Sequence, residues 1–569
     1  MRTRFLVVVL AGMSGCQQAE VDGSAPTSFD IVMPRDHAGP ITGRVYLTIG
    51  RDPANPERGK RSLGHQPVAR GRGVPFFATD IAAAPPNSVG ATIDGSTLGY
   101  PFASLRDLPA GDYWVQAVLN VYTKLDRADG HRIWAHMDQW EGQHFGWAPG
   151  NYISAIHKVR VAPSGGERIR IALVERLPDI EAPVDTKWVK RVKIQSVKLT
   201  RFWGRPIFIG ATVLLPRGYD EHPGDRYPAI YYQGHFSLSP PNGFRTERVR
   251  ESRESIAKRK DRGIENAYQF YRAWNSDGFP RVVGITFQHP TPFFDDSYAV
   301  NSANNGPYQD ALIDELIPYL EKKFRLVPQG FARALTGGST GGYESLALQI
   351  HRPKSFGGVW SLYPDSMDFR RLFGIDIYKD ANAFRVPGYG GLRPERIAVR
   401  DREGQPLQTM RQLSTLARVL GSRGRSCDYL EAWEAAFGPV GDDGYPRPLW
   451  NKATGEIDRE VASHWRDGGY DLSHYVKTHW ARIGRDLAGK IHVAVGDMDD
   501  YFFNLSVLKF QQTLESLKDP AYGGEVFYGS PLKVHGWRHV NNAELVRRMV
   551  SFMARRAPQG FDTKAWYRD

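Results

Sequence analysis

The chain has 569 residues, of which 41% are hydrophobic, so it is long enough for two or three domains with sizeable cores. Its formal net charge is +12, but the charges are scattered, and the basic cluster at 244–263 interleaves Arg and Lys with Glu and Asp, as a solvated helix does. This pattern argues against a nucleic-acid partner. Only Cys16 and Cys427 are present, so the fold is expected to hold together without an internal disulfide.

The N-terminus has the pattern of an export signal. Two arginines precede a short apolar stretch, residues 5–13, which is too short to span a bilayer. The sequence MSGC that follows resembles a bacterial lipobox and predicts a signal peptide over 1–16, lipidation of Cys16 and a tether over 17–27. Because Met13 stands where a lipobox usually has Leu, plain signal-peptidase cleavage is the alternative. We therefore expect an exported protein, lipid-anchored in the cell envelope, that faces the periplasm or the cell surface.

Residues 28–180 are predicted to form an antiparallel β-sandwich domain. Short runs alternate apolar and polar positions, and Gly, Pro and Asp turns separate them; examples are ITGRVYLTIG, GDYWVQAVLNVY and SAIHKVRVAP. The Pro-containing segment 176–186 is typical of a linker.

A different rhythm extends over residues 187–569. Apolar strands alternate with long helical segments, beginning with RPIFIGATVLLP, RYPAIYYQG, PRVVGITFQHP and ARALTGG. This alternation predicts an α/β domain with a doubly wound, mostly parallel sheet that is covered on both faces. Residues 366–486 do not follow the rhythm, and we interpret them as an insertion that forms a lid.

Ser339 lies between glycines in ALTGGSTGGYESL, residues 334–346. A β-compatible run precedes it and a helix that stops at Pro353 follows it, so the serine sits at a strand-to-helix turn. A serine held in such a strained turn needs neighbours without side chains. Because 58 glycines make this motif common by chance, the motif alone does not settle the role of the serine.

A serine hydroxyl is a weak nucleophile, so a catalytic reading requires a carboxylate and a histidine further along the chain. One apolar strand leads to a loop with Asp497, Asp499 and Asp500, and a later strand leads to a loop with His535 and His539. Loops at the carboxyl ends of parallel strands are where such sheets place catalytic groups. The order serine, acid, histidine is therefore present, and the choice within each loop is open at this point.

These segments resemble the esterase family that includes the enterochelin-type and esterase D-like enzymes of the α/β-hydrolase superfamily. The resemblance covers roughly residues 190–555, outside much of the insertion, and rests on RYPAIYYQGHF, DALIDELIPYLEKKFRL and RALTGGSTGGYESL. It implies an α/β-hydrolase fold and a serine carboxylesterase that uses a Ser-His-Asp triad.

The resemblance also implies roles for individual residues. Ser339 corresponds to the nucleophile. The family's acid lies three residues after a strand-ending glycine and shortly before an aromatic residue, which selects Asp499. Its histidine precedes a tryptophan by two positions, and the sequence HGW therefore selects His535.

Two backbone amides, those of Thr340 and His235, are implied as the oxyanion hole. Thr340 begins the helix after the nucleophile, where amides point at a developing anion. Family members often have His-Gly-x at the other position, where this chain has Gln233, Gly234 and His235. Backbone donation from His235 needs no particular side chain.

No metal or cofactor is expected. The histidines and aspartates in HWRDGGYDLSHYVKTHW lack the spacing of a zinc helix motif; they are His464, Asp467, Asp471, His474 and His479. Glycine loops of the kinds that bind phosphates or dinucleotides are absent from the sequence.

The expected substrate is a small-molecule or glycan ester, with carbohydrate esters and siderophore esters suggested by analogy with the family. Two alternatives remain open. The same triad could serve an acyltransferase, because mycolyltransferases share this fold. The chain could also be a non-catalytic envelope protein that binds a glycan.

Overall fold

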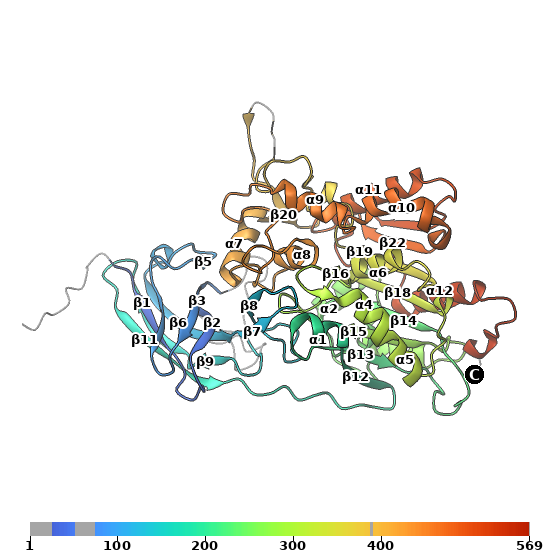
Figure 1. The fold of residues 1–569 in the computed structure, drawn as a ribbon, viewed down its shortest axis with the longest axis horizontal. Helices are drawn as coiled ribbons and strands as arrows, with labels where there is room; N and C mark the ends of the chain where they lie inside the picture. Colours follow the sequence, from blue (N-terminus) through green and yellow to red (C-terminus); the bar gives the residue numbers. More distant parts are fainter. Residues whose placement is uncertain (1–24, 52–73, 387, 389–390, 568–569) are drawn as a thin grey trace, which may run out of the picture.

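The computed structural model describes residues 25–51, 74–386, 388 and 391–567, which form an N-terminal β domain beside a larger α/β domain (Figure 1). The predicted signal peptide, the predicted lipidation site Cys16 and most of the predicted tether lie outside the described residues. Within the described residues, no helix is long and apolar enough to cross a membrane.

The N-terminal domain is built on nine strands joined in the order β4-β1-β11-β9-β6-β2-β3-β5, with β10 also paired to β6. The alternating sequence pattern forms these strands, and inward-facing residues such as Val45, Leu47 and Ile49 make the domain's core. Most pairs are antiparallel, but β1 and β11 run parallel. The described secondary structure of this domain is mainly strand, so the domain is of the β class. Its finer description as a β-sandwich stays a prediction. The strands are β1 (Ser28–Val32), β2 (Ile41–Gly50), β3 (Phe76–Ala84), β4 (Val89–Ile93), β5 (Gly99–Tyr100), β6 (Gly111–Val121), β9 (Tyr152–Ser154), β10 (His157–Val161) and β11 (Arg168–Arg176).

The α/β domain contains an eight-stranded sheet in the order β12-β13-β15-β14-β18-β19-β22-β23. The pairs β12/β13 and β13/β15 are antiparallel, and all later pairs are parallel. The four apolar runs named in the sequence are β13, β14, β15 and β18, so the predicted α/β class is confirmed. The strands are β12 (Val189–Gln195), β13 (Phe208–Leu214), β14 (Ala229–Gln233), β15 (Val283–Gln288), β18 (Arg333–Ser339), β19 (Gly358–Pro364), β22 (Ile491–Gly496) and β23 (Glu525–Gly529).

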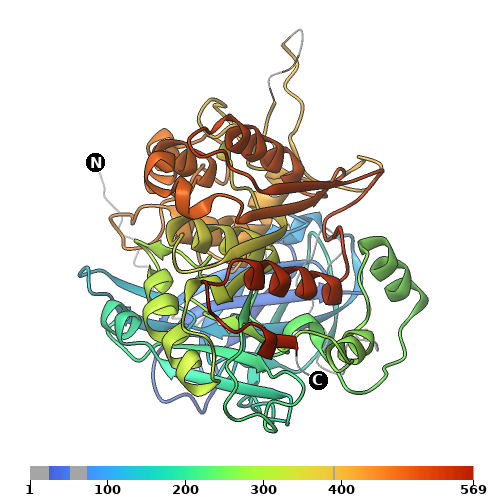
Figure 2. The ribbon, with the colours of Figure 1, turned by 90° about the vertical axis from the view of Figure 1, so that its right-hand side faces the viewer.

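Helices cover both faces of this sheet. Neighbouring strand residues such as Ile230 and Tyr231 belong to opposite apolar clusters, as the period of a strand requires. One cluster lies under α3 (Ala267–Trp274) and α12 (Asn542–Arg555), and Figure 2 shows the red helix α12 lying across the strands. The other cluster lies under α1 (Val197–Trp203), α5 (Ile317–Lys323), α6 (Thr340–His351), α10 (Leu472–Leu487) and α11 (Phe503–Ser516).

Between β19 and α10 the chain leaves the alternation of strand and helix. This segment contains a hairpin, β20 (Ile397–Arg400) and β21 (Pro406–Thr409), and three helices, α7 (Met410–Leu420), α8 (Tyr429–Phe437) and α9 (Arg459–Asp467). Although the predicted insertion extends to residue 486, α10 packs against α6 and α11 and so belongs to the layer that covers the sheet. The predicted solvated helix is α2 (Arg253–Arg262), which buries none of its residues.

The N-terminal domain holds the insertion through α7, and the two lie side by side in Figure 1. The Tyr46 hydroxyl donates to the Leu420 carbonyl at 2.6 Å, and the Arg425 guanidinium pairs with Asp80 at 3.0 Å. An apolar cluster shared by both parts surrounds Tyr46. The insertion is therefore fixed from the side of the β domain as well as from the sheet.

Candidate active site

Ser339 ends β18 with φ 59° and ψ −124°, a conformation that non-glycine residues rarely adopt. The neighbouring glycines make this sharp turn possible. A Cβ at Gly337 would lie 2.4 Å from the Gly341 carbonyl oxygen, and one at Gly341 would lie 2.1 Å from the Gln233 carbonyl oxygen. The turn presents the Ser339 side chain at the carboxyl end of the sheet, as the sequence predicts.

Three predicted side chains form a continuous hydrogen-bonded chain. The Ser339 Oγ lies 2.9 Å from His535 Nε2, and His535 Nδ1 lies 2.7 Å from Asp499 Oδ2. The other oxygen of Asp499 accepts from the amides of Tyr501 at 3.0 Å and Phe503 at 3.2 Å, and the residue is fully buried. With Nδ1–H donating to the carboxylate, Nε2 is the ring atom that can accept the serine proton.

The two other aspartates of the loop have different partners. Asp497 accepts from the amides of Leu532 at 3.2 Å and Lys533 at 2.7 Å, so it fixes the loop that carries the histidine. Asp500 accepts from the backbone amide of His535 at 3.4 Å. Only Asp499 of the three reaches the imidazole of His535.

His539 lies away from the serine. Its ring stacks on Phe527 with centroids 4.2 Å apart, and burial lowers the pKa of His539 to about 4. The structure therefore brings His535, and not His539, to Ser339.

The His535 ring is packed among three aromatic side chains. The ring centroids of Tyr363, Tyr501 and Phe503 lie 4.9, 5.0 and 5.9 Å from that of His535. These rings restrict rotation of the imidazole and leave the histidine side chain only 12% exposed.

The insertion reaches the acid loop. Arg400, the last residue of β20, donates from Nε to the Asp499 carbonyl at 3.0 Å and from its amide to the Asp500 carbonyl at 2.9 Å. Tyr429 of α8 packs edge-on against Tyr501, with ring centroids 6.1 Å apart. The insertion therefore contacts the loop that carries Asp499.

The two predicted oxyanion donors lie next to Ser339. Gln233 pairs with Gly337 in the parallel β14/β18 register, which places His235 beside the first turn of α6. Within the described part of the chain, the amides of His235 and Thr340 donate to no other protein group. Both amides are therefore available to an oxyanion.

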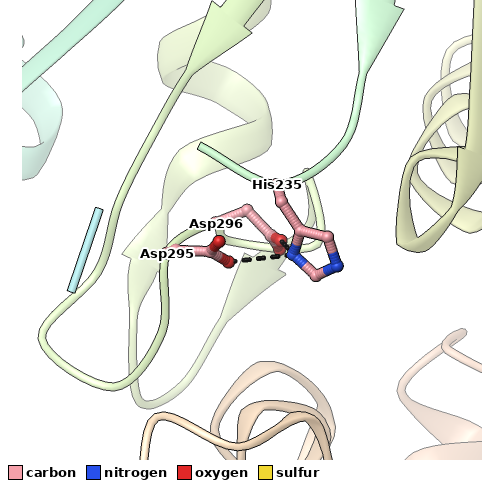
Figure 3. A group of neighbouring side chains, drawn as sticks. All are labelled: His235, Asp295 and Asp296. Atoms are coloured by element: carbon pink, nitrogen blue, oxygen red, sulfur yellow. Dashed lines mark hydrogen bonds and ion pairs between the residues drawn. The ribbon is translucent and has the colours of Figure 1, made fainter. Parts of the chain in front are cut away.

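Two carboxylates lie against Nδ1 of the His235 side chain, as Figure 3 shows. Its Nδ1 is 3.0 Å from Asp295 Oδ1 and 3.3 Å from Asp296 Oδ2, and these three residues could hold a cation. Although desolvation favours the neutral ring, Asp295 and Asp296 raise the pKa of His235 well above its usual value. Neither aspartate was predicted from the sequence.

Asp471, considered in the sequence among possible metal ligands, instead caps α10. It accepts from the amide of His474 at 2.9 Å and from the hydroxyl of Tyr378 at 2.7 Å. His479 stacks on Tyr475 with centroids 4.1 Å apart.

One buried carboxyl group beside Ser339 was not predicted from the sequence. Asp365 Oδ1 lies 3.1 Å from Ser339 Oγ, and Asp365 Oδ2 accepts from the hydroxyls of Thr340 at 3.1 Å and Tyr298 at 3.0 Å. The available signal was its position directly after β19, the strand next to that of Ser339.

Comparison with known proteins gives one family. Residues 208–369 match the family model described as "Putative esterase". The curated proteins contain no match to the chain.

Several solved structures are similar to part of the chain. A ferulic acid esterase is 15% identical, with 65% of this chain and 98% of that chain covered and a TM-score of 0.32. An S-formylglutathione hydrolase from Agrobacterium tumefaciens is 10% identical, with 66% and 98% covered and a TM-score of 0.34. MPT51 from Mycobacterium tuberculosis is 14% identical, with 66% and 99% covered and a TM-score of 0.33.

The matched residues contain the loop of His235, the turn of Ser339 and the strand that precedes Asp365. The resemblance seen in the sequence is thereby confirmed. Residues 208–369 are therefore similar to the esterase family.

Proposed function

We propose that the chain hydrolyses carboxylic esters with Ser339, His535 and Asp499 as its catalytic triad. The observation that carries this proposal is the hydrogen-bonded chain from Asp499 through both ring nitrogens of His535 to Ser339 Oγ. The strained turn of Ser339 supports it, because such outliers persist where function requires them.

The geometry suits acyl transfer to serine. His535 Nε2 takes the Ser339 proton as Oγ attacks the ester carbonyl, and Asp499 holds the ring and stabilises its cation. The amides of Thr340 and His235 donate to the carbonyl oxygen as it becomes an oxyanion. His535 then gives the proton to the departing alcohol, and water, activated by the same histidine, releases the acid and regenerates Ser339.

Carbohydrate esters, such as acetyl or feruloyl esters, and siderophore esters are the substrate classes we propose. The insertion, which contributes Arg400 and Tyr429 to the surroundings of the acid loop, would act as a lid that selects among them. The N-terminal domain, proposed to be a β-sandwich, would hold that lid in place through α7.

We also propose that the enzyme works outside the cytoplasm, with Cys16 lipidated and the protein anchored in the cell envelope. The export pattern of residues 1–16 supports this location. Metabolic labelling with an alkyne fatty acid tests it, because only a lipidated parent is labelled and Cys16→Ser abolishes the label. An unlabelled parent contradicts lipidation.

The function is tested by a screen of the purified protein against short p-nitrophenyl esters, acetylated xylan, feruloyl esters and ferric enterobactin. Hydrolysis of at least one class is expected, and no turnover of any ester would contradict the proposal. Adding an alcohol acceptor separates hydrolysis from acyl transfer. Formation of the new ester faster than release of the acid would identify an acyltransferase on the same triad.

A further inference from the structure

Asp365 is built into the turn that holds the nucleophile. It follows β19 directly, its amide donates to the Ser339 carbonyl at 3.1 Å, and it is only 4% exposed. Its Oδ1 is 3.1 Å from Ser339 Oγ, the atom proposed to attack the ester. A buried carboxyl group in this position must be compatible with a serine that gives its proton to His535.

Counting protons decides which group donates. The Ser339 hydroxyl has one proton, and His535 Nε2 at 2.9 Å needs it, because Nδ1–H is directed to Asp499. The contact between Ser339 Oγ and Asp365 Oδ1 then lacks a proton unless the carboxyl group supplies it. A carboxylic acid with its proton on Oδ1 completes the arrangement.

The other oxygen of Asp365, Oδ2, also has the partners of a protonated carboxyl group. Oδ2 accepts from two hydroxyls, those of Tyr298 and Thr340, as a carboxylic acid's carbonyl oxygen can. Among the described residues, no Arg, Lys or His forms an ion pair with Asp365 within 4.0 Å. The titratable groups that face it are His535, His235, Tyr298 and Tyr343.

Burial raises the pKa of Asp365, and the neighbouring His535, the Tyr298 hydroxyl and His235 oppose this rise. Because His535 and Asp365 both contact Ser339 Oγ, one proton can be on either group. The active arrangement has it on Asp365, which leaves His535 free to act as a base.

We propose that Asp365 is a positioning residue that acts as a neutral carboxylic acid and donates a hydrogen bond to Ser339 Oγ throughout the reaction. This inference rests on the proposed function of Ser339. The hydrogen bond directs an Oγ lone pair toward the ester while His535 removes the hydroxyl proton. When the acyl-enzyme breaks down, Oγ is the leaving group, and the same bond stabilises the charge that develops on it. Asp365 keeps its proton in both steps.

Two variants of similar size separate a neutral donor from a carboxylate. Asp365→Asn keeps a donor toward Ser339 Oγ and an acceptor toward the two hydroxyls, whereas Asp365→Leu has neither. The substrate is p-nitrophenyl acetate, and the burst of product gives the concentration of active sites, so that rates are expressed per active site. We expect Asp365→Asn to keep kcat within about threefold of wild type, because the amide replaces one neutral hydrogen-bond donor by another.

Asp365→Leu is expected to lower kcat at least about tenfold with a smaller change in KM, because the lost bond acts on the reacting oxygen. An Asp365→Asn variant with turnover at least about tenfold below wild type would overturn the proposal, since it would mean that an ionised carboxylate is needed. Wild-type turnover in Asp365→Leu would overturn it as well. If Asp365→Leu does not fold, Asp365→Asn and the pH profile still decide.

The pH profile supplies a readout that a purely structural role would not move. In the wild type, kcat/KM should fall with rising pH as Asp365 loses its proton. Asp365→Asn has no proton to lose at this position, so its profile should lose this fall. The same descending limb in both proteins would contradict the proposal.

Failure of this inference is distinguishable from failure of the proposed function. Wild-type turnover that Ser339→Ala abolishes establishes the nucleophile, whatever the result at Asp365. Turnover that survives Ser339→Ala removes the basis of both.

Discussion

The two sides of Ser339 carry buried carboxyl groups in opposite surroundings. On one side, Asp499 accepts from three N–H groups, those of Tyr501, Phe503 and the His535 ring, so both of its oxygens act as acceptors of an ionised carboxylate. On the other side, the side-chain partners of Asp365 among the described residues are the hydroxyl groups of Tyr298, Thr340 and Ser339.

The protonation state of a buried carboxyl group in this site is therefore determined by its hydrogen-bond partners and not by its position alone. In the proposed mechanism, Asp499 stabilises a cation on His535, and Asp365 places a neutral acid against Ser339 Oγ. Enzymes recurrently place two carboxyl groups in one site in surroundings that give them opposite protonation. The following experiments test each side of this comparison.

Removing the atom that both sides share should have the largest effect. We expect Ser339→Ala to fold as wild type, by circular dichroism and thermal unfolding, and to lose about a thousandfold or more in kcat/KM toward p-nitrophenyl acetate. Activity within about tenfold of wild type would exclude Ser339 as the nucleophile.

The ionised side is tested by Asp499→Asn, which keeps the volume of the side chain. Because the amide no longer stabilises the His535 cation, we expect kcat to fall about a hundredfold or more. The matched control is Asp497→Asn, in the same loop, which should keep kcat within about fivefold because Asp497 only fixes backbone amides. If the control is the more damaging change, Asp499 is not the acid.

The insertion's support of the ionised side is tested by Arg400→Met. The variant loses the hydrogen bond from Nε to the Asp499 carbonyl, so we expect the acid loop to loosen and kcat to fall about tenfold. Arg402→Met is the control, because Arg402 pairs with Asp261 at 2.6 Å outside the acid loop. Equal kcat values for the two variants would show that the insertion does not hold the triad.

The smallest effect is expected on the neutral side. Tyr298→Phe removes one of two hydroxyl donors to Asp365 Oδ2, while Thr340 remains, so kcat should fall about threefold. In Tyr343→Phe, the control, the lost hydroxyl had donated to the Tyr470 carbonyl in the same core. If Tyr343→Phe loses more kcat than Tyr298→Phe, the Tyr298 hydroxyl does not support Asp365.

The sequence predicted the parts of the site that strand order and local motif determine. Glycine is required beside Ser339 because a Cβ at Gly337 or Gly341 would lie too close to neighbouring backbone atoms. The loops after β22 and β23 meet the turn of Ser339 because the parallel strands end at the same edge of the sheet. Choosing Asp499 over Asp497 from the sequence required family resemblance, because only folding shows that Asp497 accepts from the amides of Leu532 and Lys533.

Other features depend on contacts between segments far apart in the chain. Asp365 reads as an ordinary aspartate after a strand, and its role appears only when the β18/β19 register brings it to Ser339. The attachment of α7 to the β domain joins Tyr46 to Leu420, 374 residues apart, and no local pattern marks that pair. Likewise, α10 has the composition of the insertion but packs against α6 and α11.

The assignment of Ser339 as the nucleophile is tested most directly by labelling with diethyl p-nitrophenyl phosphate, which phosphorylates activated serines. Tryptic peptides of the treated wild-type protein are sequenced by tandem mass spectrometry. We expect one diethylphosphoryl group, on Ser339, that appears with loss of esterase activity and is absent from Ser339→Ala and strongly reduced in Asp499→Asn. Inactivation accompanied by modification of a different residue, with Ser339 unmodified, would contradict the central claim.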